Sequence, residues 1–105
     1  MALLKFKAGV VVSKQTIIAA ATINAANTLG ITKTITVTSG NDSKHKVGSK
    51  HYSDEALDIR TKNLTRDEKH ALKTTTAARL GPAYDVILEF EDVANEHLHI
   101  EYDAS

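Results

Sequence analysis

Two stretches with the pattern of β-strands follow each other directly near the C-terminal end, and this arrangement limits the folds that the chain can adopt. Residues 84–90 and 97–102 each alternate apolar and polar side chains, as a half-buried strand does. Val86, Leu88 and Phe90 are expected to share the core-facing side of the first stretch. Only a short loop separates the two strands, which favours an antiparallel or mixed sheet with helices on one face, an α+β fold.

The remaining elements are predicted from periodicity and from helix-end residues. Ser13 is a candidate N-cap and Gly30 a candidate C-terminal stop for the first helix. Thr65 and Glu68 have the spacing of a capping box at the start of the second helix, which Gly81 ends. The 105 residues suffice for one domain, which we expect to span the whole chain. The expected elements are a short strand or arm over 6–12, a helix over 14–29, strands over 32–38 and 56–61, and a helix over 65–80.

Charge and composition exclude several classes of function. The 13 basic and 13 acidic residues give a formal net charge of zero, so we expect no binding to nucleic acid or to a membrane surface. There is no cysteine, so any metal must be held by histidine, carboxylate or carbonyl groups. The first residues lack a secretory pattern and no apolar run is long enough to span a bilayer. We therefore expect a monomer that is cytoplasmic when synthesised.

Two segments that lie far apart in the chain hold a dense set of metal-competent side chains. Period-two alternation places His97 and His99 on one face of one strand. His51 and Asp58 lie where a turn at the start of another strand can aim both at one point. Two histidines and one acid suit a catalytic zinc ion, which keeps a fourth position for water. We therefore predict a mononuclear Zn²⁺ site with His51, Asp58 and His99 as ligands and Glu96 beside the water.

An alternative without a metal stays open at this point. Histidines in a His-x-His pattern also occur on wet sheet faces where they bind nothing, and Asp58 could pair with Arg60 or with a lysine. The presence of all the candidates together favours the metal site over this alternative. His45, in the polar loop before His51, is a further side chain that could turn toward the same site.

Four segments in order resemble one family of zinc enzymes. They are Thr38-Ser39-Gly40, Ser49-Lys50-His51-Tyr52, Ala56-Leu57-Asp58-Ile59-Arg60 and Glu96-His97-Leu98-His99. Together they resemble the zinc-dependent D-Ala-D-Ala carboxypeptidases and L-Ala-D-Glu endopeptidases, a family that includes cell-wall peptidases of bacteria and phage endolysins. The signalling domain of hedgehog proteins shares the family's fold, so the resemblance implies a hedgehog-like or D,D-peptidase-like domain. The similarity runs over about residues 36–102.

The resemblance also implies roles for individual residues. By position, His51, Asp58 and His99 match the family's zinc ligands, and Glu96 matches its general base. In that role Glu96 would take the proton of the attacking water and pass it to the leaving amine. His97 matches a residue that lies near the metal in some members, where it would stabilise the oxyanion.

Several positions depart from the family pattern or leave alternatives open. Ser49 matches a residue that shapes the turn of the first ligand, and His45 is a second oxyanion or substrate candidate. Asp54 stands where the family has glycine, and the family's arginine after Ser-Gly is absent. Strict alternation would turn Glu96 away from the histidines. In that case Glu89, at the end of the preceding strand, is the alternative base.

The resemblance implies a single-domain zinc peptidase that acts on peptidoglycan stem peptides. Its activity would be that of a D,D-carboxypeptidase or an L-alanyl-D-glutamate endopeptidase, in a phage or prophage lytic enzyme that reaches the cell wall after release. One alternative is a catalytically weak or inactive, zinc-stabilised binding module of the hedgehog kind. Another is a structural protein whose histidines bind nothing.

Overall fold

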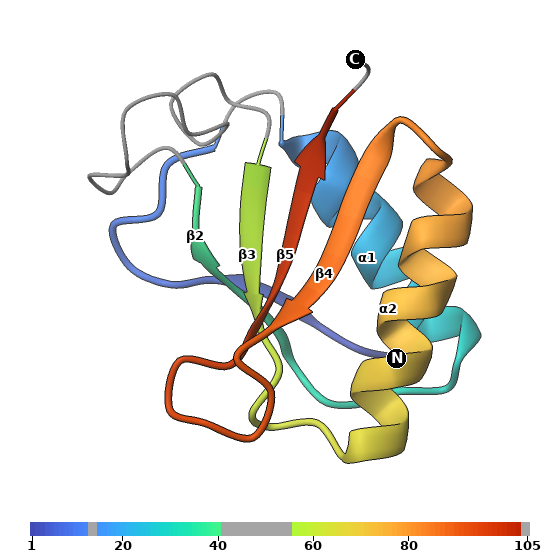
Figure 1. Ribbon diagram of the computed structural model, residues 1–105. Coiled ribbons are helices and arrows are strands. Elements are labelled where there is room, and N and C mark those ends of the chain that lie inside the picture. The colour runs from blue at the N-terminus through green and yellow to red at the C-terminus, as the bar shows by residue number, and fades with distance from the viewer. Residues whose placement is uncertain (13–14, 41–55, 104–105) are drawn as a thin grey trace.

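The described part of the chain forms one mixed sheet with helices on one face. The computed structural model describes residues 1–12, 15–40 and 56–103. In chain order, its elements are β1 (Leu4–Phe6), α1 (Thr16–Thr28), β2 (Ile35–Ser39), β3 (Ala56–Arg60), α2 (Arg66–Leu80), β4 (Tyr84–Glu89) and β5 (His97–Tyr102). The strands lie in the order β1-β2-β3-β5-β4, and both helices cover the same face of the sheet (Figure 1). The α+β class that the sequence predicts is thus confirmed. Of the described helices, none has the length and apolar character needed to cross a membrane.

The core lies between the helices and the side of the sheet that faces them. The central strands contribute alternate residues, all completely buried: Ile35, Val37, Leu57, Ile59, Leu98 and Ile100. The helices contribute Ile18, Ala25, Ala26 and Leu72. Burial of one such large aliphatic side chain stabilises the fold by about 1.5–3 kcal/mol. Since side chains alternate along a strand, the residues between these point to the opposite face, which we call the open face.

The first strand is not where the sequence predicts it. The β-branched run suggests a strand or arm over 6–12, whereas β1 lies earlier and pairs in parallel with β2. The pairing ends where the Lys7 amide donates to the Val37 carbonyl at 2.9 Å. Val10 and Val12 instead pack against the core as partly buried side chains. Tertiary pairing with β2 has therefore overridden local β-propensity.

The end of α1 agrees with the prediction. Gly30 has φ +75°, a left-handed conformation that glycine adopts without steric cost. Its amide donates to the Asn27 carbonyl at 3.1 Å, and the Ile31 amide donates to the Ala26 carbonyl at 3.0 Å. The predicted N-cap, Ser13, lies outside the described residues.

The start of α2 has the predicted capping box. The Glu68 amide donates to Thr65 Oγ1 at 3.1 Å, and the Thr65 amide donates to Glu68 Oε1 at 2.9 Å. Lys33 Nζ also donates to Glu68 Oε1, at 2.6 Å. Chiefly through this hydrogen bond, Lys33 lowers the pKa of Glu68. The same contact links the first turn of α2 to the segment before β2.

The end of β4 departs from the prediction and changes the placement of one aromatic ring. Phe90 follows the strand with φ 55°, and 59% of its surface is exposed. The expectation that it shares the core face with Val86 and Leu88 is therefore wrong. A positive φ breaks the alternation of the strand, so the ring turns outward.

Replacing the N-cap tests the contribution of the capping box. We expect Thr65→Ala to destabilise the fold by about 1 kcal/mol, because the Glu68 amide loses its acceptor. Urea unfolding measures this loss. Thr74→Ala, an exposed position in the same helix, is the control and should change stability by less than about 0.5 kcal/mol. Equal losses in both variants would rule out the cap as the cause.

Candidate metal centre

Strand register places ionisable side chains opposite one another on the open face. In the β3–β5 pair, Asp58 lies opposite His99 and Arg60 lies opposite His97. In the β4–β5 pair, Glu89 lies opposite His97. Side chains that are directly opposite in an antiparallel pair have Cβ atoms about 5 Å apart. The burial of the apolar residues on the other face therefore brings these polar groups together.

Asp58, His97 and His99 form a group that could hold a metal ion. His99 Nδ1 lies 2.8 Å from Asp58 Oδ1, and His97 Nε2 lies 3.8 Å from the same oxygen. One ligand atom from each residue lies within 4.8 Å of the others. All three side chains are half-buried. We call these residues the trio.

The other ring nitrogen of each histidine is also engaged. His97 Nδ1 donates to the Asn95 carbonyl at 2.6 Å, and His99 Nε2 donates to Glu101 Oε1 at 2.8 Å. Metal-binding histidines commonly donate this second N–H to a carbonyl or a carboxylate, which fixes the tautomer and the ring orientation. In the neutral rings, the nitrogens that face Asp58 are therefore the ones with a lone pair to offer.

The charges around the trio favour a cation. Glu89 Oε1 lies 3.0 Å from His97 Nε2 and 3.9 Å from His99 Nδ1, so three carboxylates surround two imidazoles. Hydrogen bonding to Asp58, followed by that to Glu101, outweighs burial and raises the pKa of His99 to about 9. At neutral pH, this imidazole holds a proton that a metal ion would displace.

The structure brings together some of the predicted site residues. Asp58 and His99 meet as expected, and His97 joins them at ligand distance. Glu89, the alternative base, lies beside them. The predicted third ligand, His51, falls outside the described residues and stays a prediction. The same holds for the substrate or oxyanion candidates His45 and Ser49.

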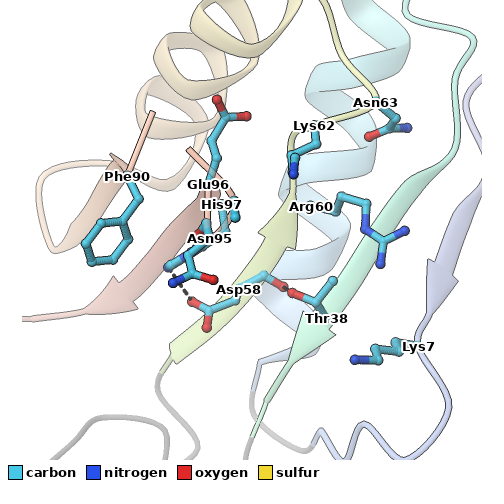
Figure 2. Close-up of a pocket in the computed structure, with 11 residues that line it drawn as sticks. Lys7, Thr38, Asp58, Arg60, Lys62, Asn63, Phe90, Asn95, Glu96 and His97 are labelled. Carbon is cyan, nitrogen blue, oxygen red and sulfur yellow. Dashed lines mark hydrogen bonds and ion pairs between the residues drawn. The ribbon is translucent and has the colours of Figure 1, made fainter. Parts of the chain in front are cut away.

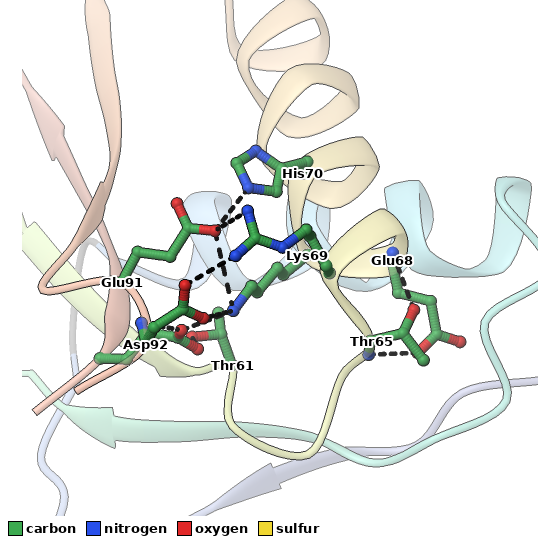
Figure 3. Close-up of polar contacts among 9 residues, drawn as sticks. Thr61, Thr65, Glu68, Lys69, His70, Glu91 and Asp92 are labelled. Carbon is green, nitrogen blue, oxygen red and sulfur yellow. Dashed lines mark hydrogen bonds and ion pairs between the residues drawn. The ribbon is translucent and has the colours of Figure 1, made fainter. Parts of the chain in front are cut away.

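Glu96 lies in a buried ion pair and is not a member of the trio. Lys69 Nζ donates to Glu96 Oε1 at 2.6 Å, Thr61 Oγ1 donates to Oε2 at 2.5 Å, and the Asp92 amide donates to Oε1 at 2.9 Å. Figure 3 shows Lys69, Thr61 and Asp92 gathered where α2 meets the segment before β5. The Glu96 side chain is only 3% exposed. Alternation places it on the same side as Leu98, away from the two histidines.

These contacts keep Glu96 ionised. Burial disfavours the charged form, but the hydrogen bonds from the Asp92 amide, Lys69 and Thr61 outweigh it and lower the pKa of Glu96 to about 2. The bond to Glu96 is also the main reason why the pKa of Lys69 is raised. A carboxylate with so low a pKa and three donors already bound is poorly suited to accept a proton in catalysis.

A cavity of about 910 Å³ adjoins the trio. Asp58, His97 and the exposed ring of Phe90 line one part of it, and Arg60 and Lys7 line another (Figure 2). The centroid of the Phe90 ring is 6.0 Å from that of His97. Glu96 also contributes to the wall, although its carboxylate is bound by Lys69. The cavity is large enough for a small peptide.

Most of the residues that line the cavity, among them Arg60 and Phe90, were not identified as site residues from the sequence. Arg60 lies two positions after Asp58, so period-two alternation alone would have placed it on the same face. Phe90 had no comparable signal, because its exposure results from a positive φ. Comparison with protein-family models, curated proteins and solved structures finds no match to this chain. The functional argument therefore depends on the geometry of the site.

Metal titration of single variants tests the trio. We expect Asp58→Asn, His97→Ala and His99→Ala each to weaken Zn²⁺ binding by at least about 100-fold, because loss of a ligand should exceed the effect of losing a hydrogen-bonding partner. Competition with a chromophoric chelator measures the affinity. His70→Ala is the control, since His70 contacts Glu91 outside the trio. An equal loss of affinity in the control would contradict a site at the trio.

The pH dependence of stability tests the ion pair of Glu96. With a folded pKa of about 2 against an ordinary value of 4.5, Glu96 stabilises the fold above pH 4.5, and this contribution is lost as the pH falls toward 2. We expect Glu96→Gln to cost on the order of 3 kcal/mol at pH 7, because Lys69 stays buried without its anion.

Urea unfolding between pH 7 and pH 2 measures this difference. The gap between the original chain and Glu96→Gln should shrink below pH 4.5 and nearly vanish near pH 2. Glu91→Gln is the control, because the Glu91 side chain is 28% exposed at the rim of the same cluster. A gap of constant size across this range would refute the assignment.

Proposed function

We propose that this chain is a zinc-dependent peptidase that cleaves peptidoglycan stem peptides, as a D,D-carboxypeptidase or as an L-alanyl-D-glutamate endopeptidase. The main support is the trio of Asp58, His97 and His99, whose ligand atoms lie within 4.8 Å of one another beside a peptide-sized cavity. The spacing of the motifs that resemble the family supplies the substrate class. A phage or prophage lytic role follows from the same resemblance.

The donor set fits zinc. Imidazole nitrogen and carboxylate oxygen are common Zn²⁺ ligands, and three protein ligands with an open position are typical of catalytic sites. A zinc ion held by the trio would polarise the scissile carbonyl and make water a stronger acid. His51 would add a further ligand or take the place of one member of the trio.

Glu89 is the general base in this proposal. Its Oε1 lies 3.0 Å from His97 Nε2 on the open face, whereas the Glu96 carboxylate is bound by Lys69 and Thr61. Glu89 would take a proton from the attacking water and pass it to the leaving amine. Glu101 would orient His99 by accepting a hydrogen bond from the other ring nitrogen, Nε2.

A second candidate function is a zinc-stabilised binding module without turnover. The observation that favours it is the buried ion pair of Glu96 with Lys69, since the residue that matches the family's base is committed to the fold. In such a module the cavity would bind a peptide, and Glu89 would serve only to orient His97.

A muropeptide digest with matched variants tests the enzyme proposal. We expect the zinc-loaded protein to release new peptide termini from bacterial walls. Glu89→Gln should lower turnover by about 100-fold to 10,000-fold with Zn²⁺ retained, because the proton acceptor is removed. Asp85→Asn, an exposed acid on the same strand and the same face, is the control. Mass spectrometry of the digest and zinc quantification measure both effects.

The outcomes separate the two candidate functions. Zinc bound at the trio with no new termini would contradict the peptidase and support the module. Equal turnover in Glu89→Gln and the control would remove Glu89 from the mechanism. Loss of turnover in Glu96→Gln with a fully folded, zinc-loaded protein would return the role of base to Glu96.

A further inference from the structure

Charge is divided across the open face of the sheet. The carboxylates and histidines of the metal centre lie on β3, β5 and β4. Basic side chains lie toward the other edge: Lys7 follows β1, Arg60 ends β3, and Lys62 follows it. All three line the same cavity as Asp58 and His97 (Figure 2). We call Lys7, Arg60 and Lys62 the basic flank.

The basic flank is not neutralised by the described part of the chain. By contrast, three basic side chains on or near α2 do contact carboxylates within 3.3 Å. Lys33 contacts Glu68, and both Arg66 and Lys69 contact Asp92. No described carboxylate forms an ion pair with any of the three flank residues. Asp58 and Glu89 are close neighbours on the face, but their carboxylates contact the histidines. Three like charges that share a cavity and have no ion-pair partner among residues 1–12, 15–40 and 56–103 favour an anionic ligand.

The position of Arg60 sets where this anion would lie. Arg60 is two residues beyond Asp58 on the same strand and faces His97 across the β3–β5 pair. Two residues of a strand span about 7 Å, which is also the spacing of alternate residues in an extended peptide. An anion bound by Arg60 would therefore lie within one or two residues of the metal centre.

From this geometry we infer that the basic flank binds a free carboxylate of the peptide, one or two residues from the bond that is cut. The inference rests on the proposed function for the identity of the ligand as a peptide. Arg60 offers a planar fork of donors that matches a carboxylate with two parallel hydrogen bonds. Lys7 and Lys62 line the same cavity and add positive charge. These residues would select free-acid peptides over their amides.

A nucleic acid is a poorer match for the same residues. The formal net charge is zero, and the Asp58 carboxylate lines the same cavity as the flank, so an extended phosphate backbone would meet repulsion. A peptide can present one carboxylate to the flank while its uncharged backbone lies against Asp58 and His97. The arrangement of one basic side and one acidic side in one cavity therefore favours a zwitterionic or singly anionic chain.

Binding of a peptide pair to the metal-free protein tests the inference without reading catalysis. The probes are L-Ala-γ-D-Glu-L-Lys amide, in which the D-Glu α-carboxylate is the only free carboxylate, and the same peptide with that group amidated. We expect the free acid to bind at least about 10-fold more tightly, because only the free acid can accept charge-assisted hydrogen bonds from Arg60. Isothermal titration calorimetry at low salt measures both affinities.

Variants assign the preference to the flank. Arg60→Gln and Lys62→Gln should each reduce the ratio of the two affinities several-fold, and Arg60→Lys should keep only part of it because the fork is lost. Lys5→Gln is the matched control. Lys5 is exposed, lies on β1 two residues before Lys7, and does not line the cavity.

Each outcome decides one proposal. Equal binding of the two peptides, no binding of either, or an unchanged ratio in Arg60→Gln would overturn the inference. Tighter binding of a short single-stranded DNA than of the free-acid peptide would overturn it in favour of nucleic acid. A clear preference for the free acid without cleavage by the zinc-loaded protein would contradict only the peptidase. Cleavage of both peptides with equal affinity would contradict only the basic flank.

Discussion

The antiparallel register of β3 against β5 determines which side chains of these two strands lie opposite each other on the open face. The pairing of Leu57 with Ile100 and of Ile59 with Leu98 is set by complete burial against the helices. A slip of one residue would turn every side chain of the strand to the other face, so Asp58 would be buried among apolar groups. That exchange would expose large aliphatic side chains and would bury a charged carboxylate, and both effects are unfavourable. The burial of the core residues therefore positions the trio on the open face.

At the beginning of β5, two adjacent residues point to opposite faces of the sheet and have different contacts. Glu96 points toward α2, where Lys69 and Thr61 bind its carboxylate, and His97 points toward the open face. A buried carboxylate is tolerated only when it is paired and hydrogen-bonded, and Glu96 meets both conditions. This ion pair links α2 to the loop that leads into β5, and it therefore fixes the position of His97, the first residue of the strand.

Acidic side chains and the basic flank lie near one another on the open face, and no ion pair joins them within the described part of the chain. Because the carboxylates of Asp58 and Glu89 are engaged by the two imidazoles, they do not neutralise Arg60, although it lies on the same face. Occupation of the trio by a cation would engage the Asp58 carboxylate further and would leave Arg60 available to an anion. The proposed metal site and the proposed site for an anionic group thus share one surface, and both proposals are based on the charge pattern of three strands.

The sequence by itself determined the elements that have a strong local period or cap. Alternation predicted which faces of β2, β3 and β5 are buried, and the Thr65 and Glu68 spacing predicted the start of α2. It also placed His97 and His99 side by side and identified Asp58 as a candidate. Only the tertiary structure decided three other features. The residues of β1 that pair with β2 precede the β-branched run, Phe90 is exposed, and Glu96 forms an ion pair with Lys69. These depend on contacts between residues far apart in the chain and on one positive φ, whereas a local pattern reports only on near neighbours.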